Sequence, residues 1–228
     1  MKTKREQNSI KTGEKGNVLI YVLIAIALFG ALSFALSRQT RNSGTEDLDE
    51  AKAELYAVQL ITYATQAKSV IDQMMFTGSD IDELDFTTPS ETSFNTAPHI
   101  HKVFHPQGGG LTLATIPKNA IHEISSVNGA KWYLGRFNNV EWSKTSATEI
   151  ILTAHQINEK VCAAINNKIT GFTTIPLLTG DIKDFLLDTS TNNDLTASSC
   201  AACEGYVTLC VGNNAGSAYS FYTVLADR

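Results

Sequence analysis

The chain has 228 residues, a formal net charge of -5 and 43% hydrophobic residues. This length fits one domain with an additional anchoring segment, or two small domains, and the apolar content excludes a wholly disordered chain. The mild acidity gives no reason to expect nucleic acid as a partner.

Residues 1–16 read as a basic leader. Two acidic residues, Glu6 and Glu14, stand among five basic ones: Lys2, Lys4, Arg5, Lys11 and Lys15. Basic residues before an apolar helix favour a cytoplasmic N-terminus. The leader therefore predicts that the chain after the apolar segment lies outside the cytoplasm.

Residues 17–37 predict a transmembrane helix. The core of this segment, VLIYVLIAIALFGALSFAL, has no charged residue and would form a helix of roughly 28 Å, about the hydrocarbon thickness of a bilayer. A cleaved secretory signal is the main alternative. Its apolar region is usually shorter, about 7–15 residues, whereas Arg38 and Arg41 follow the longer run found here.

Residues 38–76 predict an amphipathic continuation of the same helix. Thr45 is a plausible N-cap with acidic residues in the turns that follow, where the helix dipole favours them. The apolar positions recur at helical spacing and form one broad stripe, through Leu48, Leu55, Val58, Ile61 and Ile71. Gly78 is the expected end of the helix.

Residues 77–228 predict a globular head. Loop signals such as TTPSE and HPQGGG indicate turns and short strands up to residue 130. Further on, we expect strands at 131–137 and 149–153, a short helix at 154–167, and a hairpin formed by 205–211 and 218–225 around GNNAGS. The expected fold is α+β, with the long N-terminal helix packed on a small antiparallel sheet.

A basic leader, a glycine, an apolar helix, an amphipathic continuation and an antiparallel sheet follow one another, and residues 11–75 carry the pattern best. This order resembles the type IV pilin and pseudopilin superfamily. The resemblance implies that a prepilin peptidase cuts after Gly16, leaving Asn17 as the first mature residue and open to methylation. It also implies a single-pass protein of the bacterial inner membrane, with a cytoplasmic N-terminus and a periplasmic or extracellular C-terminal domain.

The resemblance implies a structural subunit of a type IV pilus or of a type II secretion filament. Its partners would be other pilin-like subunits, contacted through the N-terminal helix. Tyr21 stands where the family usually has a glutamate that neutralises the N-terminal ammonium of a neighbouring subunit. Because an unpaired buried charge is costly, Tyr21 indicates a minor or atypical subunit.

Four cysteines, Cys162, Cys200, Cys203 and Cys210, lie in the predicted head. In an oxidising compartment, four cysteines favour two disulfides, for which three pairings are open. A zinc site and a redox-active CxxC pair are the alternatives, but the surroundings of Cys200 and Cys203 read as a loop entering a strand.

Three histidines, His99, His101 and His105, would share one face of a strand and are a weak candidate for metal binding. Pro98 and Pro106 bracket them, so a solvated histidine face is the preferred interpretation, and we expect no cofactor. No nucleophile elbow, phosphate loop or paired-carboxylate pattern is present, so we expect no enzyme. Two alternatives to the filament subunit are a membrane-anchored extracytoplasmic binding protein that does not polymerise and a tethered enzyme using these cysteines or histidines.

Overall fold

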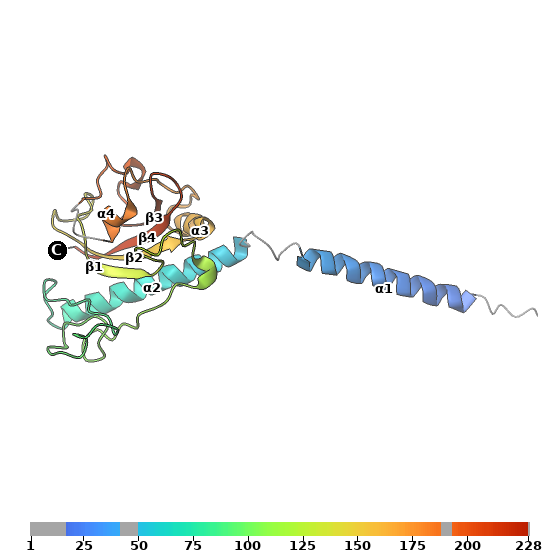
Figure 1. The fold of residues 1–228 in the computed structure, drawn as a ribbon, viewed down its shortest axis with the longest axis horizontal. Helices are drawn as coiled ribbons and strands as arrows, with labels where there is room; N and C mark the ends of the chain where they lie inside the picture. Colours follow the sequence, from blue (N-terminus) through green and yellow to red (C-terminus); the bar gives the residue numbers. More distant parts are fainter. Residues whose placement is uncertain (1–16, 42–49, 188–192, 228) are drawn as a thin grey trace, which may run out of the picture. The chain divides into compact units, whose positions relative to one another are not determined.

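The computed structural model describes residues 17–41, 50–187 and 193–227 (Figure 1). Contacts divide the chain into two units, residues 1–47 and 48–228. The first unit contains helix α1 (Asn17–Arg41). The second begins with helix α2 (Glu50–Phe76) and contains the whole sheet.

The prediction of one long N-terminal helix is wrong, because α1 and α2 are separate elements. Residues 42–49, where the two would join, lie outside the described residues. In sequence this stretch includes Asn42, Ser43 and Gly44, which have low helix propensity.

The predicted membrane span is also contradicted. None of the helices in the described ranges combines the length and the apolar character that crossing a bilayer requires. Helix α2 carries Glu54, Lys68 and Asp72 among its apolar residues. The expectation of a single-pass inner-membrane protein rested on this span and is corrected with it.

Four antiparallel strands form the sheet: β1 (Trp132–Arg136), β2 (Ile150–Ile157), β3 (Thr208–Gly212) and β4 (Tyr219–Ala226). Their order is β1-β2-β4-β3, so the C-terminal hairpin supplies one central strand and one edge strand. The predicted α+β class, with an antiparallel sheet that includes this hairpin, agrees with the structure. Both β2 and β4 are buried along their whole length, because apolar clusters lie on both faces of the sheet.

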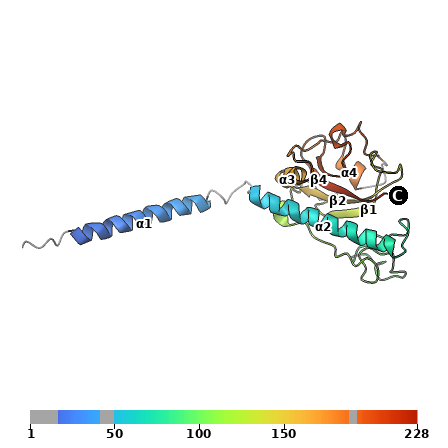
Figure 2. The same cartoon turned by 180° about the vertical axis from the view of Figure 1, so that it is seen from behind.

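Helices cover both faces of the sheet (Figures 1 and 2). On one face, α2 and α3 (Glu159–Thr170) share an apolar cluster with the strands. Small residues let α2 approach the sheet closely, at positions Ala53, Ala57, Ala64 and Ala67. On the other face, α4 (Ile182–Leu186) and the loops around it pack against β2, β3 and β4. The head is therefore a three-layer structure built on a four-stranded sheet.

The helix predicted at 154–167 begins later than expected. Residues 154–157 belong to β2 and pair with β4, and Asn158 caps α3 by accepting a hydrogen bond from the backbone N–H of Lys160. Pairing with two neighbouring strands outweighed local helix propensity at these positions. Helix α4 was not predicted.

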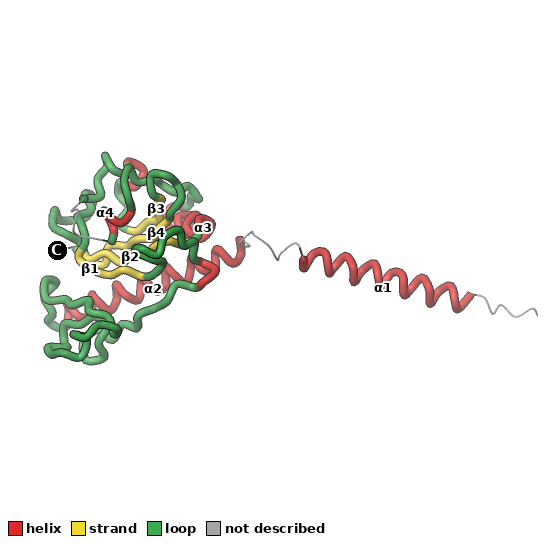
Figure 3. The backbone as a smooth tube through the Cα atoms, viewed as in Figure 1, coloured by secondary structure: helices red, strands yellow, loops and turns green. Residues whose placement is uncertain are grey.

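The long segment between α2 and β1 contains turns, isolated bridges and the 3-10 helix η1 (Lys118–Ala120). Apart from η1, it is drawn as loop in Figure 3. It lies close against α2 at Gly109. A Cβ there would come within 2.6 Å of both Met74 Sδ and the carbonyl oxygen of Val103. The glycine run, which the sequence predicts to form a turn, therefore also allows close packing against α2.

Candidate functional site

Helix α1 has an apolar surface whose described side chains are exposed. Every side chain described on this helix, from Tyr21 to Ser33, is exposed. The large apolar ones include Leu23, Ile26, Leu28 and Phe29, each more than 60% exposed. Tyr21 itself is 64% exposed, and a Cβ on Gly30 would meet no atom within 4 Å. The proposed cleavage site at Gly16 lies outside the described residues, and of Asn17 only the backbone, as the first residue of α1, is described.

The four cysteines form two disulfides, as predicted. Cys162 on α3 is bonded to Cys210 on β3, and Cys200 is bonded to Cys203 across the 3-10 helix η2 (Ala201–Cys203). None of the four is a free thiol, so they offer neither a thiolate ligand set for zinc nor a reduced nucleophile. All four are buried, and their role here is structural.

The three histidines do not lie on one strand face, because residues 99–105 form a turn-rich loop. The rings of His99 and His105 stack with their centroids 4.1 Å apart. His101 Nδ1 instead forms a hydrogen bond with Ser79 Oγ, with the two atoms 3.0 Å apart. No group of three or more metal-ligating side chains is found within the part of the chain that the structure describes. The loop therefore does not bring His101 together with the other two histidines.

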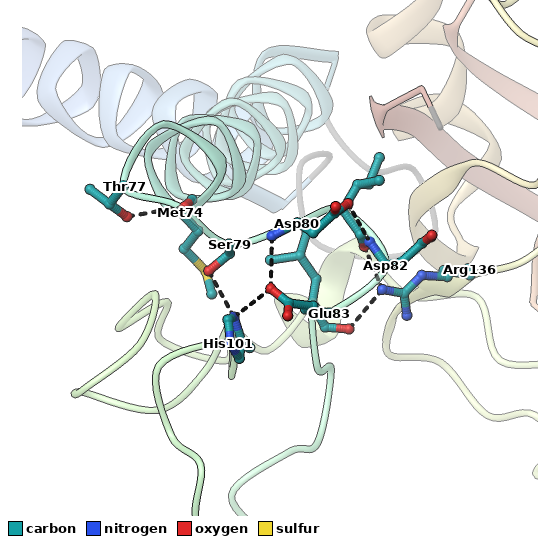
Figure 4. Close-up of polar contacts among 10 residues, drawn as sticks. Met74, Thr77, Ser79, Asp80, Asp82, Glu83, His101 and Arg136 are labelled. Carbon is teal, nitrogen blue, oxygen red and sulfur yellow. Dashed lines mark hydrogen bonds and ion pairs between the residues drawn. The ribbon is translucent and has the colours of Figure 1, made fainter.

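His101 belongs to a polar network that ties the loop after α2 to strand β1 (Figure 4). Glu83 accepts a hydrogen bond from the backbone N–H of Asp80 and lies 3.5 Å from His101 Nδ1. On the other side of this loop, Arg136 on β1 donates to the carbonyl oxygens of Ile81 and Leu84. The network fixes the loop by contacts from two directions.

Lys102 is a buried cation next to this network, with only 3% of its surface exposed. Its ammonium group donates to three backbone carbonyl oxygens, those of Ser93, Phe94 and Thr96. A lysine ammonium has three N–H donors, so each of them has a partner. Lys102 thus holds the turn at residues 93–96 in place.

His155 and Ser220 form a buried pair between the two central strands. His155 Nδ1 lies 2.7 Å from Ser220 Oγ, and Tyr133 contacts the imidazole edge to face. Burial lowers the pKa of His155 to about 4, with Asp181 acting weakly in the opposite direction. Ser220 is completely buried, so no substrate reaches its hydroxyl group. This pair holds β2 to β4 and is not a nucleophile with its base.

Sequence reasoning missed Lys102 and the His155–Ser220 pair. A lone lysine in a polar loop carries no signal of burial, since lysine is usually exposed. His155 stands within an apolar run, which was a usable signal, but the helix predicted there placed it on the wrong element.

Comparison of the chain with protein-family models, with curated proteins and with solved structures found no match.

Proposed function

We propose that this chain is a pilin-like structural subunit that assembles with copies of itself, or with related subunits, through helix α1. The observation that carries the proposal is the continuous exposure of apolar side chains on α1, including Leu23, Leu28 and Phe29. Burying such a surface is favourable by about 25 cal/mol per Å2 of apolar area, and helices of several copies bury it by packing side by side.

The composition of α1 suits close packing between helices. Ala25, Ala27, Gly30 and Ala31 lie among the larger apolar residues, and small side chains let two helix backbones approach each other. Tyr21 takes the position of the family's charged residue and supports a minor or atypical role within such an assembly. A prepilin-type peptidase that cuts after Gly16 is the expected processing partner.

Assembly is tested by placing a charge on α1. Leu28→Glu is expected to abolish self-association of the full chain, because the carboxylate would be buried against another helix. Val127→Glu is the matched control, since Val127 is also an exposed apolar residue but lies in the head, at 76% exposure against 66% for Leu28. Sedimentation velocity and electron microscopy of both variants and the parent chain measure the outcome. A parent chain that stays monomeric, or a Leu28→Glu variant that still assembles, contradicts the proposal.

Processing is tested by intact mass. We expect the mature protein to lack residues 1–16, and Gly16→Leu to retain them. A full-length mature protein that does not self-associate would instead favour the alternative of a binding protein that does not polymerise.

A further inference from the structure

A groove runs beside the start of strand β1. It has a volume of about 490 Å3 and an apolar floor. The side chains that matter here are Leu113, Ile116, Ile121 and Trp132, with Lys118 and Lys131 beside them. The groove involves neither helix α1 nor the disulfides, so it is independent of the proposed assembly surface.

One wall of the groove is an edge strand with unused hydrogen-bonding groups. Lys131 accepts a hydrogen bond from His155 of β2, and Phe137 donates one to Glu149. In an antiparallel pair these bonded positions alternate with positions whose N–H and C=O point away from the partner strand. Trp132 and Leu134 are such positions, and β1 is the outermost strand. Within the described ranges, the backbone N–H and C=O groups of Trp132 and Leu134 form no hydrogen bond.

The opposite wall, residues 112–116, also has backbone groups without a hydrogen-bond partner among the described residues. Residues 112–116 have no regular secondary structure, and among the described residues the backbone N–H groups of Leu113 and Thr115 find no acceptor. This segment is tied to the core at Ala114, whose N–H donates to Tyr63 Oη at 3.4 Å. Tyr63 in turn packs on Trp132, with ring centroids 4.8 Å apart. The two walls thus rest on a common base but leave a gap between them.

Gln156 fixes the segment that joins two lining residues of the groove, Ile121 and Ala130. Its side-chain oxygen accepts from the N–H groups of Ile124 and Ser125, and its amide nitrogen donates to the carbonyl oxygens of Ser125 and Asn128. Gln156 has a φ of 55°, a conformation uncommon for residues other than glycine. A preformed groove lowers the entropy lost on binding.

The rim of the groove is basic. Lys118 and Lys131 are both exposed, and neither has a carboxylate within ion-pair distance in the part of the chain that the structure describes. Lys131 lies over the ring of Tyr133, 4.8 Å from its centroid, which keeps the ammonium close to the strand. An acidic group on the occupant would complement these two charges.

We propose that this groove binds an extended peptide segment of a partner protein, which adds to β1 as a further strand. Its backbone pairs with the outward N–H and C=O groups of Trp132 and Leu134. Its alternate side chains are apolar and enter the floor of the groove, because side chains of a strand alternate between two faces. An acidic side chain of the same segment faces Lys118 and Lys131.

The proposal is tested with the full chain and a phage-displayed library of random linear heptapeptides. We expect enriched peptides to share alternating apolar residues and at least one acidic residue. A synthetic peptide of the enriched sequence is expected to bind saturably and to slow amide hydrogen exchange at Trp132 and Leu134.

Two sets of variants locate the site. Leu134→Pro removes one outward N–H, a change that edge strands tolerate, and is expected to weaken binding about tenfold. The double variant Lys118→Glu, Lys131→Glu leaves the strand unchanged and is expected to weaken binding of the acidic peptide by at least as much. Lys52→Glu, an exposed lysine on α2, is the control and is expected to bind as the parent does.

The proposal fails if no peptide is enriched, or if the enriched peptides lack the alternating acidic pattern. It also fails if a bound peptide leaves the exchange of Trp132 and Leu134 unchanged, or if the double lysine variant binds as tightly as Lys52→Glu.

Discussion

At the residue scale, His155 makes stability depend on pH. The pKa of its buried imidazole is about 4, below the ordinary value of 6.5. As the pH falls through 6.5 the unfolded chain takes up a proton, but the folded chain does not until about pH 4. The free energy of unfolding therefore decreases between these values, by about 3 kcal/mol in total, and this contribution levels off below pH 4.

Urea unfolding at a series of pH values from 7 to 4 measures this dependence. His155→Asn keeps a polar group near Ser220 without a titrating ring, and is expected to flatten the dependence. His122→Asn, on an exposed histidine, is the control and should keep the slope of the parent chain. Equal slopes for the parent and His155→Asn would show that His155 does not carry the effect.

Lys102 is a buried charge that stabilises the fold through the three carbonyl oxygens to which it donates. Lys102→Met is expected to lower the free energy of unfolding by about 2–4 kcal/mol, because three carbonyl oxygens would lose their donor. Lys144→Met is the control, since the Lys144 side chain is 89% exposed. Chemical denaturation of the two variants gives the comparison, and equal stabilities would contradict the role assigned to Lys102.

At the scale of elements, the two disulfides should contribute unequally. The Cys162–Cys210 bond joins residues 48 apart and links α3 to β3, whereas Cys200 and Cys203 are only three apart. Loop-closure entropy predicts about 4 kcal/mol for the long loop and about 2 kcal/mol for the short one. Thermal unfolding of the two double-alanine variants checks this order. A larger loss for the Cys200, Cys203 variant would reverse the prediction.

At the scale of the whole molecule, residues 50–228 should fold without the segment that precedes them. Both apolar clusters of the described residues lie between Ala53 and Ala226, and so do both disulfides. We expect this fragment to unfold cooperatively within a few degrees of the full chain and to remain monomeric in size-exclusion chromatography. A fragment that unfolds without cooperativity would show that the missing segment contributes to the fold.

Local sequence patterns predicted which helices and strands form better than they predicted where each one begins and ends. Alternation and turn residues located β1 and the C-terminal hairpin, and helical spacing located α2. Because apolar residues recur at helical spacing from Ile157 through Val161 to Ile165, the helix predicted at 154–167 includes Ala154 to Ile157. Their pairing with Phe221 and Ser220 comes from the far end of the chain, so no local signal reports it.

The expectation of one continuous N-terminal helix, membrane-spanning at 17–37 and amphipathic at 38–76, was wrong for a different reason. It extended an apolar run of charge-free residues through a polar stretch and into a helix with charges. Composition alone does not show where one helix ends and the next begins, whereas the structure separates α1 from α2.

The sequence by itself determined the α+β class, the helical character of residues 17–41 and 50–76 and the oxidised state of the four cysteines, because these depend on neighbouring residues and on residue type. The pairing of Cys162 with Cys210, the burial of Lys102 and His155, and the open edge of β1 were decided only by the tertiary structure. Each of these depends on which distant segments meet in the folded chain. Those contacts are set by how the apolar area of the whole chain is buried, which no local window of sequence contains.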